Sequence, residues 1–385
     1  MRKILFVASE AVPFIKTGGL ADVVGSLPKC FDKQYFDVRV MIPKYACIPD
    51  EWKNKMVYKT HFYIDLAWRK QYVGIMELQH NGITFYFIDN EYYFKREGEI
   101  AYLYGYGDDA ERYTFFSNAV LEAMSILNFY PDIVHLNDWH TGMIPLILKE
   151  KYSHSKKYKN IKTVYTIHNL QYQGVFSDSI IEDVLDIPRA YYNNGDIEYY
   201  GGVSFMKSGI VFSDKVIAVS PTYSNEIQTE FYGEGLDGLL KSKSHKLKGI
   251  LNGIDYDLNN PLTDGDIFVN YDINSIDKKI ENKLKLQEVL GLDVNPDIPL
   301  IGIVSRLVSQ KGFDLISYMM PEIIRENLQV VILGTGEHQY QSMFNYYDSH
   351  FPNKVSARIT FDSAFAQQIY AGSDMFLMPS LFEPC

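Results

Sequence analysis

The chain has 385 residues, of which 46% are hydrophobic and 22% charged, and its formal net charge is −11. This length exceeds what one hydrophobic core usually supports, so two domains are expected. The acidic balance excludes a general basic surface for nucleic acid, and no run approaches the roughly 20 apolar residues that a membrane span requires.

The apolar run in the N-terminal stretch MRKILFVASE is too short to act as a secretion signal. The stretch is expected to form the first strand. Three widely spaced cysteines, Cys30, Cys47 and Cys385, fit neither a disulfide framework nor a zinc pattern. Cysteine usage therefore predicts a cytoplasmic protein. The oligomeric state cannot be read from the sequence.

Short runs rich in Val, Ile and Phe recur along the chain and predict strands. They lie at residues 3–9, 38–43, 83–89, 132–138, 163–169, 215–221, 300–307, 329–336, 357–361 and 375–380. Stretches with helical spacing separate many of them, for example 108–127 and 275–292. This alternation predicts an α/β protein with parallel sheets. The polar, turn-rich segment 255–275 marks the expected change of domain, which gives domains 1–254 and 255–385.

Open parallel sheets bind ligands beyond the carboxyl ends of their strands. The residues that follow the predicted strands include many that can bind a ligand or take part in catalysis: Glu10, Lys16, Asp138, His140, His168, Asn169, Arg306, Lys311 and Gly334. Two such sheets facing each other would form a cleft.

Lys16 precedes Gly18 and Gly19 at the point where a strand has ended and a helix is about to begin. The glycines let the backbone approach a ligand, the helix start offers unpaired N–H groups, and Lys16 adds a positive charge. The stretch therefore fits a phosphate cradle, and an ordinary glycine turn with a solvated lysine fits it as well. It does not match the nucleotide-hydrolase loop, because the lysine precedes the glycines.

A second pair of cations lies in the segment SRLVSQKG, where Arg306 ends a strand and Lys311 begins a helix. Cations that converge beside a helix N-terminus would suit a diphosphate leaving group, and each alone would be a surface charge. The segment LGTGEHQ lacks the third glycine of the dinucleotide fingerprint, which disfavours a nicotinamide enzyme.

Histidines and carboxylates gather in HLNDWHTG and YTIHN, where an acid/base or a metal site is conceivable. His135 lies inside a predicted strand and is expected to be structural. The spacing H-x-x-D-x-H matches no metal signature, so no metal site is expected. The patterns DYD at 255–257 and DGD at 264–266 could hold a metal in another class of glycosyltransferase, but three-letter patterns arise easily by chance.

Six motifs, KTGGLADVVGSLPK, HLNDWHTG, TIHNLQYQG, LNGID, SRLVSQKG and PSLFEPC, together resemble the bacterial glycogen synthase and plant starch synthase family, in the family's order from Ser9 to Cys385. The resemblance implies two facing Rossmann-like domains, the GT-B arrangement, with the second domain truncated in this chain. It also implies transfer of glucose from ADP-glucose or UDP-glucose to the nonreducing end of an α-1,4-glucan, with retention of configuration and without a cofactor. The sequence does not distinguish the two donors.

The resemblance also assigns roles to single residues. The implied donor-binding residues are Lys16, Gly18, Gly19, Arg306, Lys311, Gly334, Phe361 and Glu383, with Phe361 stacking on the base and Glu383 binding glucose hydroxyls. The implied sugar and acceptor residues are Glu10, Asp22, Tyr102, Asp138, His168, Asn169 and Asn252, with Asp22 also ordering the Lys16 loop. The catalytic set would be Lys16, His168, Arg306, Lys311 and Glu383.

The sequence departs from the family pattern in three places. Leu381 stands where many members carry Arg or Lys, and Phe361 replaces a common tyrosine. Members continue beyond Cys385 for roughly another 90 residues, more than any frayed terminus would account for. We therefore expect exposed apolar edges in 255–385 and weak or no catalysis from this chain. The alternatives are a non-catalytic protein that binds glucan or nucleotide sugar, and another GT-B enzyme that forms sucrose or trehalose or acts as a phosphorylase.

Overall fold

The computed structural model describes residues 1–96 and 103–385. The chain divides into two compact units. Unit 1 comprises Met1–Gly253 with Pro384–Cys385, and unit 2 comprises Ile254–Glu383. Within the described ranges, no helix is both long and apolar enough to cross a membrane.

Unit 1 is built around a sheet whose described strands follow the order β12-β11-β7-β6-β1-β2-β5-β4-β3. Their bounds are β1 Arg2–Val7, β2 Phe36–Pro43, β3 Val57–Leu66, β4 Arg69–His80, β5 Ile83–Asp89, β6 Ile133–Asn137, β7 Lys162–Ile167, β11 Lys215–Ala218 and β12 Leu247–Gly249. The strands from β12 to β5 run parallel, as the alternation of strands and helices predicts.

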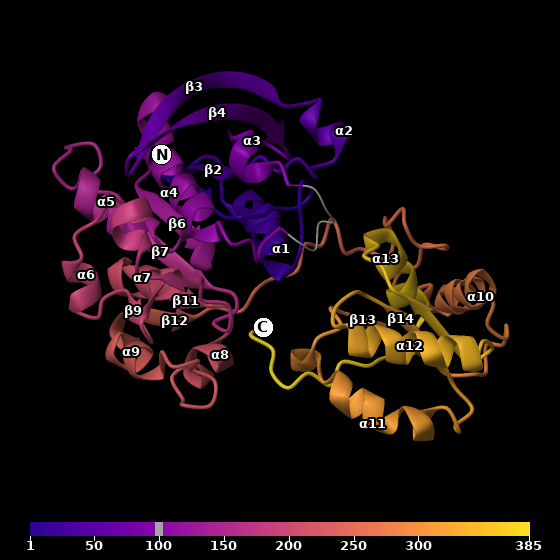
Figure 1. Ribbon diagram of the computed structural model, residues 1–385. Helices are drawn as coiled ribbons and strands as arrows, with labels where there is room; N and C mark the ends of the chain where they lie inside the picture. Colours follow the sequence, from indigo (N-terminus) through magenta and orange to yellow (C-terminus); the bar gives the residue numbers. More distant parts are fainter. Residues whose placement is uncertain (97–102) are drawn as a thin grey trace. The chain divides into compact units, whose positions relative to one another are not determined.

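The remaining two strands of this sheet were not predicted, and they run antiparallel. β3 and β4 form a long curved hairpin at one edge of the sheet (Figure 1). Only Ala67 and Trp68 separate them, and Ala67 adopts a φ of 50°. A two-residue connection permits only antiparallel pairing, so the expectation of parallel sheets fails here. The short strands β8 Val175–Ser177, β9 Glu198–Tyr199 and β10 Gly202–Ser204 form a further antiparallel sheet.

Helices flank the sheet of unit 1. Their bounds are α1 Gly19–Ser26, α2 Asp50–Lys53, α3 Glu91–Phe94, α4 Asp109–Ile126, α5 Ile144–Tyr152, α6 Ala190–Asn193, α7 Phe205–Phe212, α8 Pro221–Glu226 and α9 Asp237–Ser242. The helix predicted at 108–127 is α4, but it is buried on most sides rather than on one face. It packs against β3, β5 and α5, so even Arg112 on this helix is fully buried.

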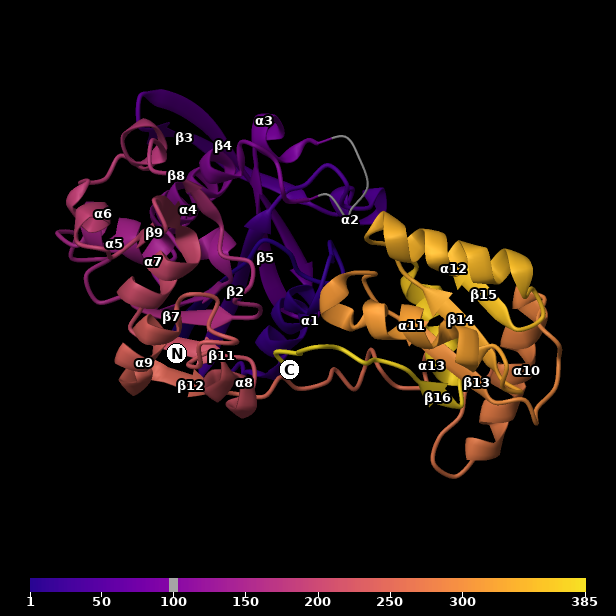
Figure 2. The ribbon, with the colours of Figure 1, turned by 60° about the horizontal axis from the view of Figure 1, so that its bottom comes forward.

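Unit 2 contains a parallel sheet whose described strands follow the order β15-β14-β13-β16. The bounds are β13 Leu300–Val304, β14 Gln329–Leu333, β15 Val355–Arg358 and β16 Met375–Phe376, with α10 Lys279–Leu290, α11 Phe313–Ile323, α12 His338–His350 and α13 Ser363–Gly372. Apolar clusters place α11 and α12 on one face and α10 and α13 on the other (Figures 1 and 2). Met375, Phe376 and Met378, in and after the edge strand β16, are about half exposed.

Candidate functional site

Three predicted site residues come together at one edge of the sheet in unit 1. β1, β6 and β7 are parallel neighbours, so their carboxyl ends lie side by side. Glu10, Asp138 and His168 follow these strands, and an Asp138 carboxylate oxygen accepts a hydrogen bond from the backbone amide of His168 at 2.7 Å. Asp138 adopts a left-handed φ of 54°, a conformation that costs energy in residues other than glycine and clusters at functional sites.

Burial decides the protonation of this cluster. Loss of water raises the pKa of Glu10 to about 8, against hydrogen bonds from Thr17 that lower it. It raises the pKa of Asp138 to about 7, against hydrogen bonds from the backbone amides of His168 and Asn169. The pKa of His168 falls to about 3, again through burial first, so its ring is neutral at neutral pH.

The loop that carries Lys16 is held at two points. Lys16 Nζ forms an ion pair with Asp22 at 2.8 Å, and the amide and hydroxyl of Thr17 both donate to the Glu10 carboxyl group, the hydroxyl at 3.1 Å. A Cβ at Gly18 would meet no atom within 4 Å, and the same holds for Gly19, so there is open space beside the start of α1. Sequence reasoning missed Thr17, because nothing in KTGG marks it as the partner of a carboxyl seven residues earlier.

The other predicted residues of unit 1 take different positions. Asn169 is adjacent to His168, and its side chain accepts the Gln171 amide at 3.0 Å. Asn252 lies three residues beyond β12, which is the edge strand of the parallel region. No described contact joins Asn252 to the cluster of Glu10, Asp138 and His168. His135 lies inside β6, as predicted, and its Nε2 is 2.7 Å from the hydroxyl of Thr166.

No described hydrogen bond joins His140 to the cluster of Glu10, Asp138 and His168. Its ring is buried and stacks on Trp139 with centroids 3.9 Å apart, and Tyr104 packs on it at 4.3 Å. Burial holds the pKa of His140 well below its ordinary value. A buried, stacked ring of this kind is part of the core, so His140 is a poor candidate for proton transfer.

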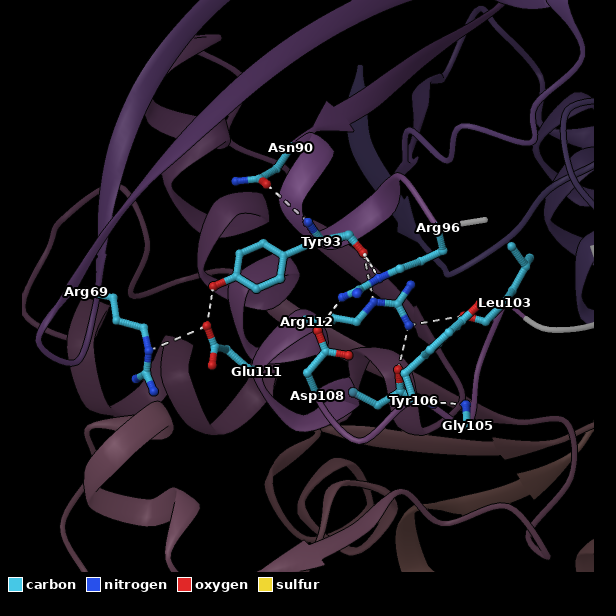
Figure 3. A network of polar contacts seen from close by, with 11 residues as sticks. Arg69, Asn90, Tyr93, Arg96, Leu103, Gly105, Tyr106, Asp108, Glu111 and Arg112 are labelled. Atoms are coloured by element: carbon cyan, nitrogen blue, oxygen red, sulfur yellow. Dashed lines mark hydrogen bonds and ion pairs between the residues drawn. The ribbon is translucent and has the colours of Figure 1, made fainter. Parts of the chain in front are cut away.

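Tyr102, predicted on the acceptor side, lies outside the described residues. The described chain on both sides of residues 97–102 is fixed to α4 by Arg112 (Figure 3). Arg112 donates to the backbone oxygens of Tyr93 at 2.9 Å and Leu103 at 3.1 Å, while the Asp109 carboxylate accepts the amide of Gly105 at 2.7 Å.

Tyr104 lies between these two anchored residues, Leu103 and Gly105, and its hydroxyl donates to the Ser9 hydroxyl at 2.9 Å. The network around Arg112 therefore reaches the chain next to Glu10.

In unit 2, the predicted donor residues also follow neighbouring strands. Arg306 comes after β13, Gly334 after β14 and Phe361 after β15. The amide of Leu307 donates to the oxygen of Thr335 at 2.8 Å, which joins the first two loops. Phe361 is 56% exposed, so it is accessible to a ligand.

Lys311 pairs with the other predicted ligand of this unit. Its Nζ lies 2.6 Å from a carboxylate oxygen of Glu383, across 72 residues of sequence. The amide of Leu381, the residue that departs from the family pattern, donates to the oxygen of Gln310 at 2.9 Å. The C-terminal segment of unit 2 is thereby held against the turn that carries Lys311.

A metal site was not predicted, and the described part of the chain contains no group of three or more His, Cys, Asp or Glu side chains placed to hold a metal ion. Asp257 and Asp266, from the DYD and DGD patterns, are exposed.

Known proteins of similar sequence are starch and glycogen synthases. Residues 3–242 match the family model of the starch synthase catalytic domain. The chain is 66% identical over 383 residues to a glycogen synthase of Clostridioides difficile (strain 630), covering 100% of this chain and 80% of that protein. It is 52% identical to a glycogen synthase of Clostridium novyi (strain NT), covering 99% and 79%.

Solved structures of known proteins also match the fold of this chain. The catalytic domain of starch synthase IV from Arabidopsis thaliana, bound to ADP and acarbose, matches with a TM-score of 0.92 at 31% identity, over 100% of this chain and 79% of that one. Sucrose-phosphate synthase from Thermosynechococcus elongatus matches at a TM-score of 0.58 and 13% identity, which shows the shared GT-B fold alone. On the strength of its sequence and its fold, the chain belongs to the bacterial glycogen synthase and plant starch synthase family.

Proposed function

We propose that this chain is a retaining glucosyltransferase that moves glucose from a nucleotide sugar to the nonreducing end of an α-1,4-glucan. The observation that carries the proposal is the meeting of Glu10, Asp138 and His168 at the ends of β1, β6 and β7, beside the loop that presents Lys16. The names of the relatives, and the ADP and acarbose bound to the Arabidopsis protein, support the two substrates.

The chemistry requires stabilisation of a departing nucleoside diphosphate. The bond between glucose C1 and the phosphate oxygen breaks, and a bond from C1 to an acceptor hydroxyl oxygen forms on the same face. The acceptor proton passes to the departing phosphate oxygen. Each donor or cation aimed at the developing charge contributes roughly 10²–10³ in rate. Lys16, Arg306 and Lys311 are the cations assigned to this task, and the proposal requires all three to meet one diphosphate.

The cations also let the reaction proceed without a metal or another cofactor, which is part of the proposal. Exhaustive chelation should leave the transfer rate unchanged, and loss of activity restored by a divalent ion would contradict this part. The donor is ADP-glucose or UDP-glucose, because stacking on Phe361 tolerates either base. Competition between the two unlabelled donors in one assay decides the preference.

A cytoplasmic location completes the proposal, supported by Cys30, Cys47 and Cys385, which are all free thiols. Cell fractionation tests this location.

The function is tested by calorimetry with ADP and a maltooligosaccharide, set beside incorporation of radiolabelled glucose. We expect binding of both ligands and slow growth of the oligosaccharide by single glucose units. Binding of both without any incorporation would favour the non-catalytic alternative. Failure to bind either one would overturn the proposal.

A further inference from the structure

Asn137 is the last residue of β6 and is completely buried between β1 and β7. Its amide nitrogen donates to the backbone oxygen of Val7 at 3.0 Å and lies 3.5 Å from that of His135. Its amide oxygen lies 3.0 Å from Nε2 of His168. Asn137 therefore touches the imidazole of a predicted catalytic residue. It lies in the motif HLNDWHTG, but the sequence assigned it no role.

The contacts of Asn137 fix the orientation of its amide group. The two backbone oxygens on one side accept hydrogen bonds only, so the NH₂ group must face them. A flipped amide would place two oxygens against each other at 3.0 Å and leave a buried carbonyl unsatisfied. Oδ1 of Asn137 must then face His168, and an amide oxygen can only accept a hydrogen bond.

The orientation of Asn137 in turn fixes the proton on His168. Nε2 lies within hydrogen-bond distance of an atom that only accepts, so Nε2 carries the hydrogen. Burial keeps the ring neutral by lowering its pKa to about 3, and a neutral imidazole has one N–H. Nδ1 is therefore unprotonated and offers a lone pair.

We propose that Asn137 is a positioning residue that holds His168 in the Nε2–H tautomer, so that Nδ1 accepts a hydrogen bond from a hydroxyl group of the sugar. The first half of this inference concerns the protein alone, and the second half rests on the proposed function. A site with a fixed acceptor favours a sugar with a hydroxyl at the facing position over the deoxy analogue, which leaves Nδ1 without its partner.

The neighbouring buried histidine provides the contrast. Nε2 of His135 faces the hydroxyl of Thr166 at 2.7 Å, and a hydroxyl both donates and accepts. That contact does not select a tautomer. His135 lies on β6 and His168 directly follows the neighbouring strand β7, so His135 and Thr166 serve as a matched internal control.

The tautomer is tested by ¹⁵N NMR of the histidine side chains in the full chain, with His168→Asn used to assign the signals. We expect a protonated Nε2 and an unprotonated Nδ1 on His168. Asn137→Leu should disturb this pattern, and Asn137→Asp, which keeps an acceptor, should retain the hydrogen on Nε2. Thr166→Val should move only the signals of His135. An Nδ1–H tautomer in the wild type, or an unchanged His168 spectrum in Asn137→Leu, would overturn the inference.

The sugar contact is tested with a series of monodeoxyglucose donors. For the wild type, one analogue should lose roughly 2- to 12-fold in kcat/KM, the range of one hydrogen bond. Asn137→Leu should lose a similar factor with the natural donor, show no further loss with that analogue, and bind ADP as the wild type does. Equal discrimination by both proteins would contradict the sugar contact. If no protein transfers glucose, the proposed function fails, and the NMR result still decides the tautomer.

Discussion

At the scale of single residues, the Glu10 carboxyl group stands out because its described hydrogen bonds come from Thr17 and its carboxylate neighbours raise its pKa further. The resemblance assigns Glu10 to the sugar side, and that role stays a prediction. The structure adds a second role, since the same carboxyl group holds the loop that carries Lys16. The hydrogen bonds from Thr17 are stronger to the ionised carboxyl group, so they lower its pKa and oppose the effect of burial.

The raised pKa of Glu10 makes stability fall as pH rises. The folded state prefers the protonated form, so its contribution is complete below pH 4.5 and is lost as pH rises to about 8. One pKa unit corresponds to about 1.4 kcal/mol, so the effect amounts to several kcal/mol. Glu10→Gln should flatten this fall, measured by thermal unfolding from pH 4.5 to 8. The stability of Glu10→Gln should still fall with pH, with a smaller slope, because burial also raises the pKa of Asp138.

The control for this experiment is the exposed Glu230→Gln, which should follow the wild-type curve at every pH. An equal fall in Glu10→Gln and the wild type would show that Glu10 is ionised in the folded chain.

Lys16 yields a second prediction at this scale. Its side chain is 40% exposed and is held by an ion pair with Asp22, so it is ordered and still accessible to a ligand. Lys16→Ala should weaken ADP-glucose binding or slow transfer by roughly 10²–10³. Calorimetry and initial rates measure the two effects. Lys159→Ala, at an exposed site, is the control, and unchanged affinity and rate in Lys16→Ala would remove that residue from the mechanism.

At the scale of secondary-structure elements, parallel strands with short turns explain why predicted residues meet. In unit 2, the turn from β13 to α11 carries both Arg306 and Lys311, and it ends at Gly312, the N-cap of α11. Gly312 has a φ of 74°, and a Cβ there would lie 2.0 Å from the backbone oxygen of Pro379. The close approach brings the C-terminal segment, with Glu383, against the turn that carries Lys311.

Gly312→Ala should therefore cost more than the backbone strain alone. Gly291, which follows α10 with a φ of 69° and open space at the Cβ position, provides the matched control. Gly291→Ala should cost about 1–3 kcal/mol from strain, and Gly312→Ala should exceed it because the clash displaces Pro379. Denaturant unfolding followed in unit 2 compares the two. Equal losses would show that the segment before Glu383 moves away freely.

At the scale of the whole molecule, the described apolar clusters divide between the two units. One large cluster fills unit 1, and two smaller ones cover the faces of the sheet in unit 2. Domains with separate cores commonly unfold in separate steps. A substitution in one core is therefore expected to act on its own unit first.

Two ion pairs with the same spacing test this expectation. Asp109 and Arg112 form an i,i+3 pair that is almost completely buried in unit 1, whereas Glu322 and Arg325 form an exposed one in unit 2. Arg112→Met leaves a buried carboxylate unpaired and should cost about 3–5 kcal/mol. Arg325→Met should cost at most about 1 kcal/mol.

Hydrogen exchange with mass spectrometry reads each unit separately. Arg112→Met should speed exchange in α4 and β5 and leave β13 and β14 unchanged. A comparable increase in both units would show that they unfold together.

The sequence alone predicted the strands of the parallel regions except the short β12, the helices that became α4 and α10, the family, and the placement of Lys16, Arg306 and Lys311 after strands. These features depend on apolar spacing and on residue types that are close in the sequence. The β3 and β4 hairpin was missed because its exposed edge carries polar and aromatic residues instead of a continuous apolar run.

Contacts between side chains that are distant in the sequence are visible only in the folded chain. The contact of Asn137 with His168 joins two strands that are about 30 residues apart, and Lys311 meets Glu383 across 72 residues. Such pairs depend on strand order and register, which no local pattern encodes. The same holds for the protonation of Glu10 and His168, because a pKa responds to burial, and burial is a property of the folded chain.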